Sequence, residues 1–276
     1  MMVTLVFIFR MIHLLILLNI FRLNQGLLNK LTPLKSNEIG KDSIFHVILP
    51  STKNLKNKMK LYYSNTSPYS RKVRLVIRLK GLESQVEEVL VNPFGEGTAN
   101  NFALMEANPL GKIPTLLLDD GTGLFDSPVI CHYLDNLSNN TLLIPADNKQ
   151  RLNVLRWEAM TDGLTDATYN IAIERKRPAN EQSSTWINRW SSEIKRTLLY
   201  IESSLDEINP ADKNSVTLTH LALASALSYL ELRLPEALYK SGEPEITIAP
   251  NTLAWYTTFK NSSAMKATQL IDLQKQ

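Results

Sequence analysis

The strongest constraint on the fold of this chain is a strand–helix–strand pattern that begins at Met59. Met59–Ser64 alternates enough to predict a strand, Pro68–Lys80 has helical spacing, and Gln85–Val91 is β-branched and predicts a second strand. Two strands joined by a helix in this way form a parallel pair with a right-handed crossover. The pattern therefore predicts the first half of an α/β domain.

The helix of this unit begins with a pattern that can present a hydroxyl group. Ser67 is a good N-cap, because its side-chain oxygen can accept from the free amides of the first turn, and Pro68 suits the first helical position. Gly81 predicts the helix end. A helix N-terminus stabilises an anion through its free N–H groups and its partial positive charge. Ser67 would hold a hydroxyl beside this positive end, where a strand of an α/β sheet ends.

The residues that follow complete the α/β domain. They predict a helix, a strand, a tight hairpin, a short antiparallel strand and a last helix: Thr98–Ala107, Ile113–Leu118, Asp119–Gly121, Gly123–Phe125 and Ser127–Asn136. Ser127-Pro128 repeats the N-cap-then-proline pattern. Pro114 near a strand start indicates an edge strand or a cis bond, because proline cannot donate to the ladder. The expected order is βαβ, then α, then ββα.

The pattern changes after residue 138, and the remainder predicts helices only. Residues 139–148 are polar and read as a linker between a first domain at 59–138 and a second at 149–270. The expected helices are Leu152–Arg175, Glu181–Glu207, Val216–Leu234 and Asn251–Lys260. Val216–Leu234 is more apolar than its neighbours, which predicts a central buried helix.

Residues 1–58 differ from the rest of the chain. They carry eight Lys and Arg residues against two Asp and Glu, and two apolar runs that Arg10 interrupts. This is a poor transmembrane helix. Three interpretations remain open: a start codon assigned too early, with Met59 as the true start, a targeting or membrane segment, or a structured extension. The remaining residues carry a net charge of −3 and no concentrated basic face, so we expect no nucleic-acid partner.

Cysteine and histidine usage restricts the chemistry. Cys131 is the only cysteine, so an intrachain disulfide and a cysteine-based metal cluster are both excluded, and a reducing compartment is favoured. The four histidines have no metal-ligand spacing, and we expect no metal. We expect Cys131 itself to be a buried structural residue.

Three motifs of the first domain form a recognisable set. They are Ser67-Pro68-Tyr69-Ser70, Asn108-Pro109-Leu110-Gly111-Lys112-Ile113-Pro114 and Phe125-Asp126-Ser127-Pro128. In order, in spacing and in the helical domain that follows, this set resembles the glutathione S-transferase superfamily. It is most similar to uncharacterised bacterial glutathione transferase-like proteins, which share the pattern at Glu158–Gly163 and Arg177-Pro178. The resemblance covers about Met59 to Leu270.

The resemblance implies a thioredoxin-like first domain that binds glutathione, followed by an all-α helical bundle. The Ile113–Pro114 bond would be cis, and the backbone of Ile113 would meet the cysteinyl part of glutathione. Asp126 would pair with the γ-glutamyl ammonium group, Ser127 would take the γ-glutamyl carboxylate, and Lys112 could take the glycine carboxylate. Ser67 would be the catalytic hydroxyl.

Several alternatives stay open at this level. Ser67 could be a simple N-cap, with Thr66 or Tyr63 as the activating hydroxyl. Asp126 and Ser127 could only cap their helix, and Lys112 could be a solvated loop residue. The aromatic residues of the second domain are expected in the core or an interface before a substrate pocket: Trp157, Tyr169, Trp186 and Trp190.

The resulting hypothesis is a cytoplasmic, homodimeric glutathione transferase. It would join the glutathione thiolate to a small apolar electrophile, as detoxifying enzymes do. The rivals are a glutathione-dependent disulfide or peroxide reductase and a non-catalytic glutathione-transferase-like binding protein. Relatives that perform disulfide chemistry have Cys-Pro-Tyr-Cys at the turn; Ser67 and Ser70 exclude a dithiol mechanism here. A further departure lies at Thr217 and His220, where the family places a Ser/Thr-x-x-Asp capping box, so the reciprocal bond to an acidic side chain is expected to be missing.

Overall fold

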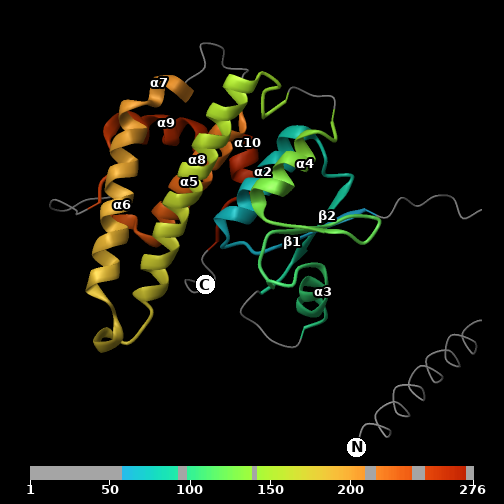
Figure 1. The fold of residues 1–276 in the computed structure, drawn as a ribbon, viewed down its shortest axis with the longest axis horizontal. Coiled ribbons are helices and arrows are strands. Elements are labelled where there is room, and N and C mark those ends of the chain that lie inside the picture. Colours follow the sequence, from blue (N-terminus) through green and yellow to red (C-terminus); the bar gives the residue numbers. More distant parts are fainter. Residues whose placement is uncertain (1–57, 93–97, 139–141, 209–215, 238–245, 272–276) are drawn as a thin grey trace, which may run out of the picture. The chain divides into compact units, whose positions relative to one another are not determined.

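The computed structural model describes residues 58–92, 98–138, 142–208, 216–237 and 246–271 (Figure 1). The predicted leader lies outside these ranges apart from Lys58. Within the described ranges, no helix combines the length and the apolar character that crossing a membrane requires.

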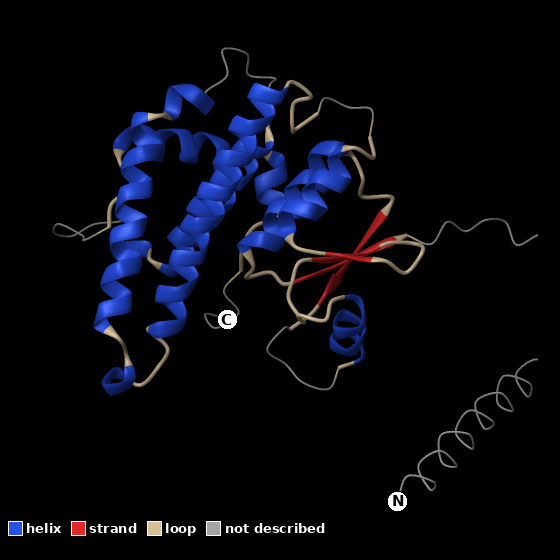
Figure 2. Ribbon diagram, in the orientation of Figure 1, coloured by secondary structure: helices blue, strands red, loops and turns tan. Residues whose placement is uncertain are grey.

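The first domain is a four-stranded mixed sheet with three helices. Its elements are β1 (Met59–Tyr63), α2 (Pro68–Lys80), β2 (Val86–Leu90), α3 (Ala99–Ala107), β3 (Thr115–Leu117), β4 (Gly123–Leu124) and α4 (Ser127–Asp135). The strand order is β2-β1-β3-β4, with β1 and β2 parallel and the other pairs antiparallel. Helices α2 and α4 lie on one face of the sheet and α3 on the other (Figure 2). This is the thioredoxin-like βαβαββα order that the sequence predicts.

Two glycines explain how the chain turns in this domain. Gly81 ends α2 in the left-handed conformation, at φ 65°, and its N–H reaches the carbonyls of Arg78 and Ile77. Gly123 begins β4 where the strand passes the end of α3. A Cβ at this position would lie 1.9 Å from the carbonyl oxygen of Ala107, so the close approach requires glycine.

The second domain is helical. Its elements are α5 (Asn148–Glu174), η1 (Ala179–Glu181), α6 (Ser184–Ser203), α7 (Leu205–Ile208), α8 (Leu218–Arg233), η2 (Pro235–Ala237), α9 (Pro250–Lys260) and α10 (Ser263–Ala267). Helix α5 begins four residues before the prediction because Asp147 caps it, accepting from the N–H of Gln150.

The prediction of a single helix at Glu181–Glu207 was wrong. Ser183 has extended backbone and caps α6 by accepting from the N–H of Trp186, so the residues before it form a separate 3₁₀ turn. Ser204 then separates α6 from α7. Helix α10 was not predicted at all, because five residues provide too little periodicity to detect.

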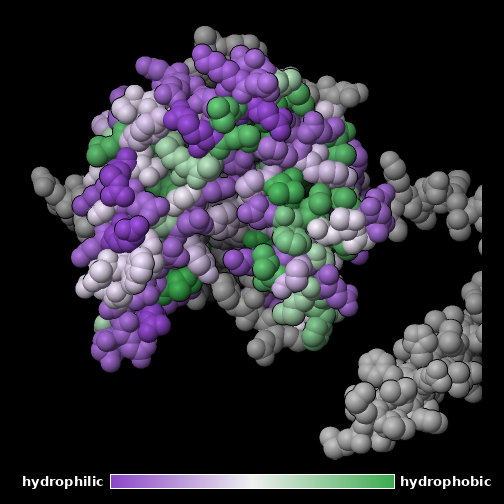
Figure 3. Space-filling model, viewed as in Figure 1, coloured by the Kyte–Doolittle hydropathy of each residue, from purple (hydrophilic) through white to green (hydrophobic). Residues whose placement is uncertain are grey.

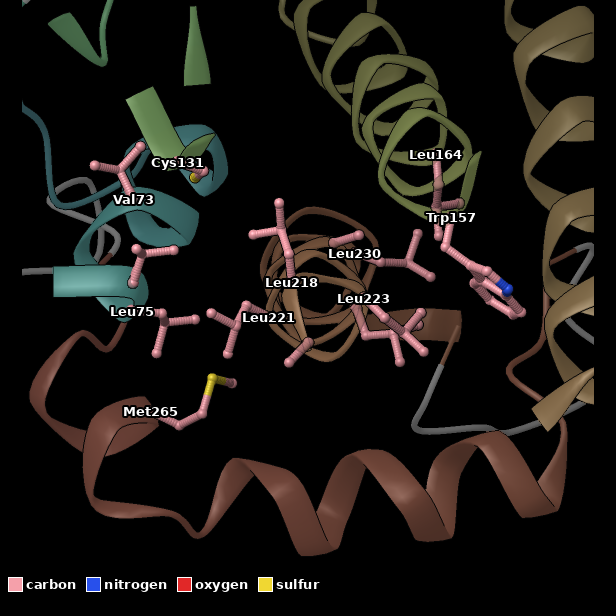
Figure 4. Packing of buried hydrophobic residues seen from close by; sticks show 14 of the residues in the cluster. Val73, Leu75, Cys131, Trp157, Leu164, Leu218, Leu221, Leu223, Leu230 and Met265 are labelled. Atoms are coloured by element: carbon pink, nitrogen blue, oxygen red, sulfur yellow. The ribbon is translucent and has the colours of Figure 1, made fainter. Parts of the chain in front are cut away.

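Helix α8 lies at the centre of the helical domain, as its apolar composition predicts. Every residue from Leu218 to Leu230 is buried. Figure 4 shows why: Leu221 points toward Leu75 of α2, whereas Leu223 and Leu230 point toward the side of α5 that carries Trp157. Trp157 is fully buried, which confirms its expected place in the core. Helix α8 therefore joins the cores of the two domains.

The start of α8 lacks the bond to an acidic side chain, as expected, but a histidine makes a reciprocal capping bond in its place. His220 occupies the place of the acidic residue, and its Nδ1 accepts from the backbone N–H of Thr217 at 3.0 Å. A neutral imidazole can thus complete the capping box. Burial lowers the pKa of His220 below its ordinary value, which favours this neutral form.

Candidate functional site

The sheet brings all three sequence motifs to one of its ends. Tyr62 near the end of β1 pairs with Thr115 at the start of β3, and Leu116 pairs with Leu124 at the end of β4. The Ser67 turn follows β1, the Pro114 loop precedes β3, and Asp126 follows β4. Because β3 is antiparallel to both neighbours, these three segments emerge at the same end of the sheet.

Ser67 caps α2 with its side chain. Its Oγ accepts from the N–H of Ser70 at 3.1 Å, and the residue is 9% exposed. A hydroxyl has one proton to donate and two lone pairs, so a hydroxyl that accepts from an amide still has its proton. The N-cap interpretation is therefore correct, and it is compatible with donation to an anion at the positive end of α2.

The two alternative hydroxyls have other neighbours. Thr66 Oγ1 lies 3.3 Å from Ser64 Oγ, within the same turn. The ring of Tyr63 lies beneath the guanidinium group of Arg74, 4.4 Å from its carbon. Of these three hydroxyl residues, Ser67 is the one that caps α2.

Asn108 organises the loop before β3. Its side-chain N–H groups donate to the carbonyl oxygen of Lys112 at 3.1 Å and to Thr115 Oγ1 at 2.9 Å, while its Oδ1 accepts from Leu110 N–H at 2.9 Å. The Lys112 side chain is exposed. The Ile113–Pro114 bond is cis, as the sequence predicts, and the alternative of an edge strand is wrong because β3 lies between β1 and β4.

The start of α4 differs from its prediction by one residue. Asp126 is the N-cap and Ser127 the first helical residue, so Ser127 does not repeat the role of Ser67. The reason is the backbone: Asp126 is extended, at φ −92° and ψ −160°, and its carbonyl accepts from Ile130 N–H at 3.1 Å. The Asp126 side chain makes no capping bond and is exposed, whereas Ser127 is buried. The Phe125–Asp126 bond is also cis.

A buried ion cluster connects α2 to α5. Lys72, 1% exposed, donates to Glu158 Oε1 at 2.9 Å and to Asp162 Oδ2 at 2.7 Å. Burial by itself lowers the pKa of Lys72, but the two carboxylates outweigh it, and this pKa lies above its ordinary value. Burial raises the pKa of Asp162 to about 6. The pattern at Glu158–Gly163 thus has a structural role, as the partner of Lys72.

Two further groups lie along this junction. The Tyr69 hydroxyl donates to Asp166 Oδ1, so a second contact joins α2 to α5 close to Ser67. Cys131 of α4 is completely buried, and burial raises the pKa of its thiol. It behaves as the structural cysteine that the sequence predicts.

Sequence reasoning missed three contributors to this site. The side chains of Asn108 and Tyr69 belong to quoted motifs but were assigned no role, and Lys72 was passed over as one of several basic residues in a helix. Two signals were available in the sequence. Asn108 is a polar residue in the loop before the cis proline, and Lys72 is a lysine on the buried side of a helix. Within the described residues, no group of three His, Cys, Asp or Glu side chains could hold a metal ion.

The comparisons with known proteins agree with this arrangement. Residues 66–137 match the family described as "Glutathione S-transferase, N-terminal domain". A protein of Escherichia coli strain K12, described as the uncharacterized GST-like protein YibF, is 33% identical over 175 residues, which cover 63% of this chain and 83% of that protein. The chain therefore belongs to the glutathione S-transferase superfamily.

Two solved structures with the same fold contain bound glutathione. A glutathione S-transferase of Methylobacillus flagellatus KT with glutathione bound is 36% identical, with a TM-score of 0.68, and the match covers 78% of this chain and all of that one. A glutathione transferase family member of Pseudomonas fluorescens Pf-5 with bound glutathione is 29% identical, with a TM-score of 0.67 and the same coverage.

Proposed function

We propose that this protein is a glutathione transferase, which joins the thiolate of glutathione to a small electrophile. The observation that carries the proposal is the convergence of the Ser67 turn, the cis-Pro114 loop and the Asp126 turn at one end of the sheet. The glutathione bound to two related structures supports the choice of co-substrate.

Each part of glutathione has a proposed partner at this end of the sheet. The backbone of Ile113, before the cis Pro114, binds the cysteinyl residue. Asp126 pairs with the γ-glutamyl ammonium group, and its exposed carboxylate, unused in capping, supports this role. Ser127 binds the γ-glutamyl carboxylate at the start of α4. Lys112, exposed beside the loop, binds the glycine carboxylate.

The Ser67 hydroxyl then activates the thiol. A free thiol with a pKa of about 8.5 is only about 3% ionised at pH 7, and lowering this pKa by about two units requires about 2.7 kcal/mol. A hydrogen bond to a charged group contributes about 1.5–3 kcal/mol. The N-terminus of α2 adds about 0.3–1 kcal/mol. One hydroxyl at this helix start is therefore sufficient in magnitude, and holding the electrophile beside the thiolate supplies the rest by proximity.

The electrophile, the oligomeric state and the location complete the proposal. We expect a small apolar electrophile between the domains and a homodimer in the cytoplasm. A cluster of exposed apolar side chains on and beside α3 supports the dimer: Phe102, Met105 and Leu110. Figure 3 shows apolar residues gathering on the side of the thioredoxin-like domain, while the outer helices of the other domain are more polar. The buried Cys131 fits a reducing compartment and provides no accessible protein thiol for a reductase.

The test is titration calorimetry of glutathione into the full chain, with Asp126→Ala and Ser67→Ala as variants. We expect wild type to bind in the micromolar to millimolar range, Asp126→Ala to lose about 10- to 150-fold in affinity, and Ser67→Ala to bind within about threefold. The thiolate absorbance of bound glutathione should titrate about one to two pH units higher in Ser67→Ala.

A wild-type protein that releases no heat at millimolar glutathione would contradict the transferase proposal and favour a protein-binding role. If Ser67→Ala retains the wild-type thiol pKa, the activating hydroxyl is another one, and Thr66→Val and Tyr63→Phe become the variants to examine.

A further inference from the structure

The C-terminal segment of the chain lies against the turn that carries Ser67. After α9, helix α10 (Ser263–Ala267) packs against α2, and the described residues continue from it to Ile271. The backbone N–H of Ile271 donates to the carbonyl oxygen of Asn65 at 3.0 Å. Asn65 is two residues before Ser67, so the described end of the chain is bonded directly to the turn.

A second contact fixes the same segment to α2. Arg71, four residues after Ser67, donates from Nη2 to the carbonyl oxygen of Met265 at 2.9 Å, and its Nε lies 3.5 Å from Thr268 Oγ1. Met265 O belongs to the last turn of α10, so the guanidinium group also meets the negative end of that helix. The turn and the first turns of α2 are thus held from the same side.

The burial of these groups distinguishes the segment from a loose tail. Met265, Thr268 and Leu270 are 1%, 0% and 9% exposed, and Arg71 is 5% exposed. Thr268 Oγ1 also donates to the carbonyl of Ala264 at 2.8 Å, which holds the segment in shape. Figure 4 shows Met265 directed toward Leu75 and Leu221, so the segment is anchored in the core that joins the two domains.

Ser67 is joined to α2 by bonds of ordinary length, from Ser70 N–H to its Oγ at 3.1 Å and from Arg71 N–H to its carbonyl oxygen at 3.0 Å, but the bonds within the turn Ser64–Ser67 are longer. Ser67 N–H donates to the Ser64 carbonyl at the long distance of 3.3 Å, and the Ser64 and Thr66 hydroxyls also lie 3.3 Å apart. Bonds at these distances are weaker than those at the usual 2.9–3.0 Å. The bond from Ile271 to Asn65 therefore adds a constraint to the residues that lead into Ser67, where the turn's own bonds are longest.

We propose that the segment from Ser262 to Ile271 is a brace that fixes the turn Ser64–Ser67 and so positions the Ser67 hydroxyl. Ile271 acts as a positioning residue through the turn, and Arg71 through the first turn of α2. This inference rests on the proposed role of Ser67. Misplacing a catalytic group by about 1 Å can cost about 100-fold in rate, so a contact of this kind can influence chemistry without entering the site.

A matched pair of substitutions at one position tests the brace in the full chain. Ile271→Pro removes the N–H that donates to the carbonyl oxygen of Asn65, and the proline ring pushes the two backbones apart. Ile271→Ala removes most of the side chain and keeps the N–H. The position is at the exposed margin, 36% exposed, so both variants should fold with thermal midpoints close to that of wild type.

Two measurements are made on wild type and both variants. The first is amide hydrogen exchange of a peptide covering residues 61–69, without glutathione. We expect Ile271→Pro to exchange at least about threefold faster than wild type, and Ile271→Ala to match wild type. The second is the pKa of the bound glutathione thiol, together with the dissociation constant. We expect Ile271→Pro to raise this pKa by about 0.5–1 unit, with affinity within about twofold.

Unchanged exchange in Ile271→Pro overturns the brace whether or not glutathione binds. Faster exchange with an unchanged thiol pKa overturns the positioning role while the brace itself stands. Equal effects of Pro and Ala would overturn the assignment to the backbone bond. A wild-type protein that does not bind glutathione would instead overturn the proposed function, and the positioning role with it, while the exchange measurement still decides the brace.

Discussion

The starts of α2 and α4 share the dipeptide Ser-Pro but use it in different ways. At α2 the serine is the N-cap, is buried, and accepts from the amide of Ser70. At α4 the register is one residue earlier: Asp126 is the N-cap, and its exposed side chain makes no capping bond. One helix start thus uses its side chain to stabilise itself, and the other leaves a carboxylate available. Two similar motifs therefore differ in whether the side chain of the N-cap residue stabilises its helix.

The largest expected effect is at the flank of α2, where Lys72 holds the helix against α5. Lys72→Met would leave Glu158 and Asp162 buried without their cation, and we expect it to lower the free energy of unfolding by about 3–5 kcal/mol. Chemical denaturation measures this loss. Lys60→Met, at an exposed position of β1, is the control and should change stability by less than about 0.5 kcal/mol.

Adding Asp162→Asn to Lys72→Met should recover part of that loss, because one fewer carboxylate is left unpaired. A double variant as unstable as the single one would show that Lys72 contributes through packing of its aliphatic chain instead of its charge.

The comparison of the two helix starts predicts unequal effects on stability. Ser67→Ala removes a capping bond and should lower the free energy of unfolding by about 1 kcal/mol. Asp126→Ala removes none and should stay within about 0.5 kcal/mol. Denaturant midpoints of the two variants decide this, with Ser67→Thr as the control that keeps a capping oxygen. Equal losses in the two alanine variants would remove the distinction between the starts.

The start of α8 extends the comparison to a cap that can titrate. His220 has a pKa lowered by burial, so the unfolded chain binds more protons than the native protein between this pKa and about 6.5. Its contribution to stability is complete above about pH 6.5 and is lost as the pH falls toward the native pKa. His220→Gln keeps a side-chain acceptor for the Thr217 N–H without titrating.

Unfolding curves of wild type and His220→Gln at pH 5.5 and pH 7.5 test this sign. The stability of wild type relative to the variant should be lower at pH 5.5 than at pH 7.5. A constant difference between the two proteins would mean that protonation of His220 does not oppose the fold.

The smallest loss of stability is expected at the second serine of the turn motif. Ser70 is fully buried, and its Oγ has no hydrogen-bond partner among the described residues. Ser70→Ala removes a buried hydroxyl that gains nothing from the fold, so stability should stay equal or increase by up to about 1 kcal/mol. Thermal denaturation beside Ser67→Ala makes the contrast direct, and a loss as large as that of Ser67→Ala would indicate an unrecognised partner.

Much of the fold follows from local signals in the sequence. Ser67, Pro68 and Gly81 define both ends of α2, and the apolar composition of α8 predicts its central place. Errors arose where one residue decides a boundary, as at Ser183 and Asp126, because competing caps differ by small free energies. The bond between Ile271 and Asn65 could not be predicted, since it joins backbone groups 206 positions apart and has no side-chain signature. The pairing of Lys72 with α5 likewise depends on packing between domains.

The single cysteine of this chain makes an internal reporter. In the native protein Cys131 is 1% exposed beside Lys72, and burial raises the pKa of its thiol, so an alkylating reagent should not reach a reactive thiolate there. Labelling then requires the layer formed by α2, α4 and α5 to open. The rate at which an excess of reagent modifies the unaltered protein would therefore measure the opening of this layer directly. Because the Cys131 thiol is shielded, electrophiles supplied together with glutathione can be assayed without a competing reaction at the protein's own thiol.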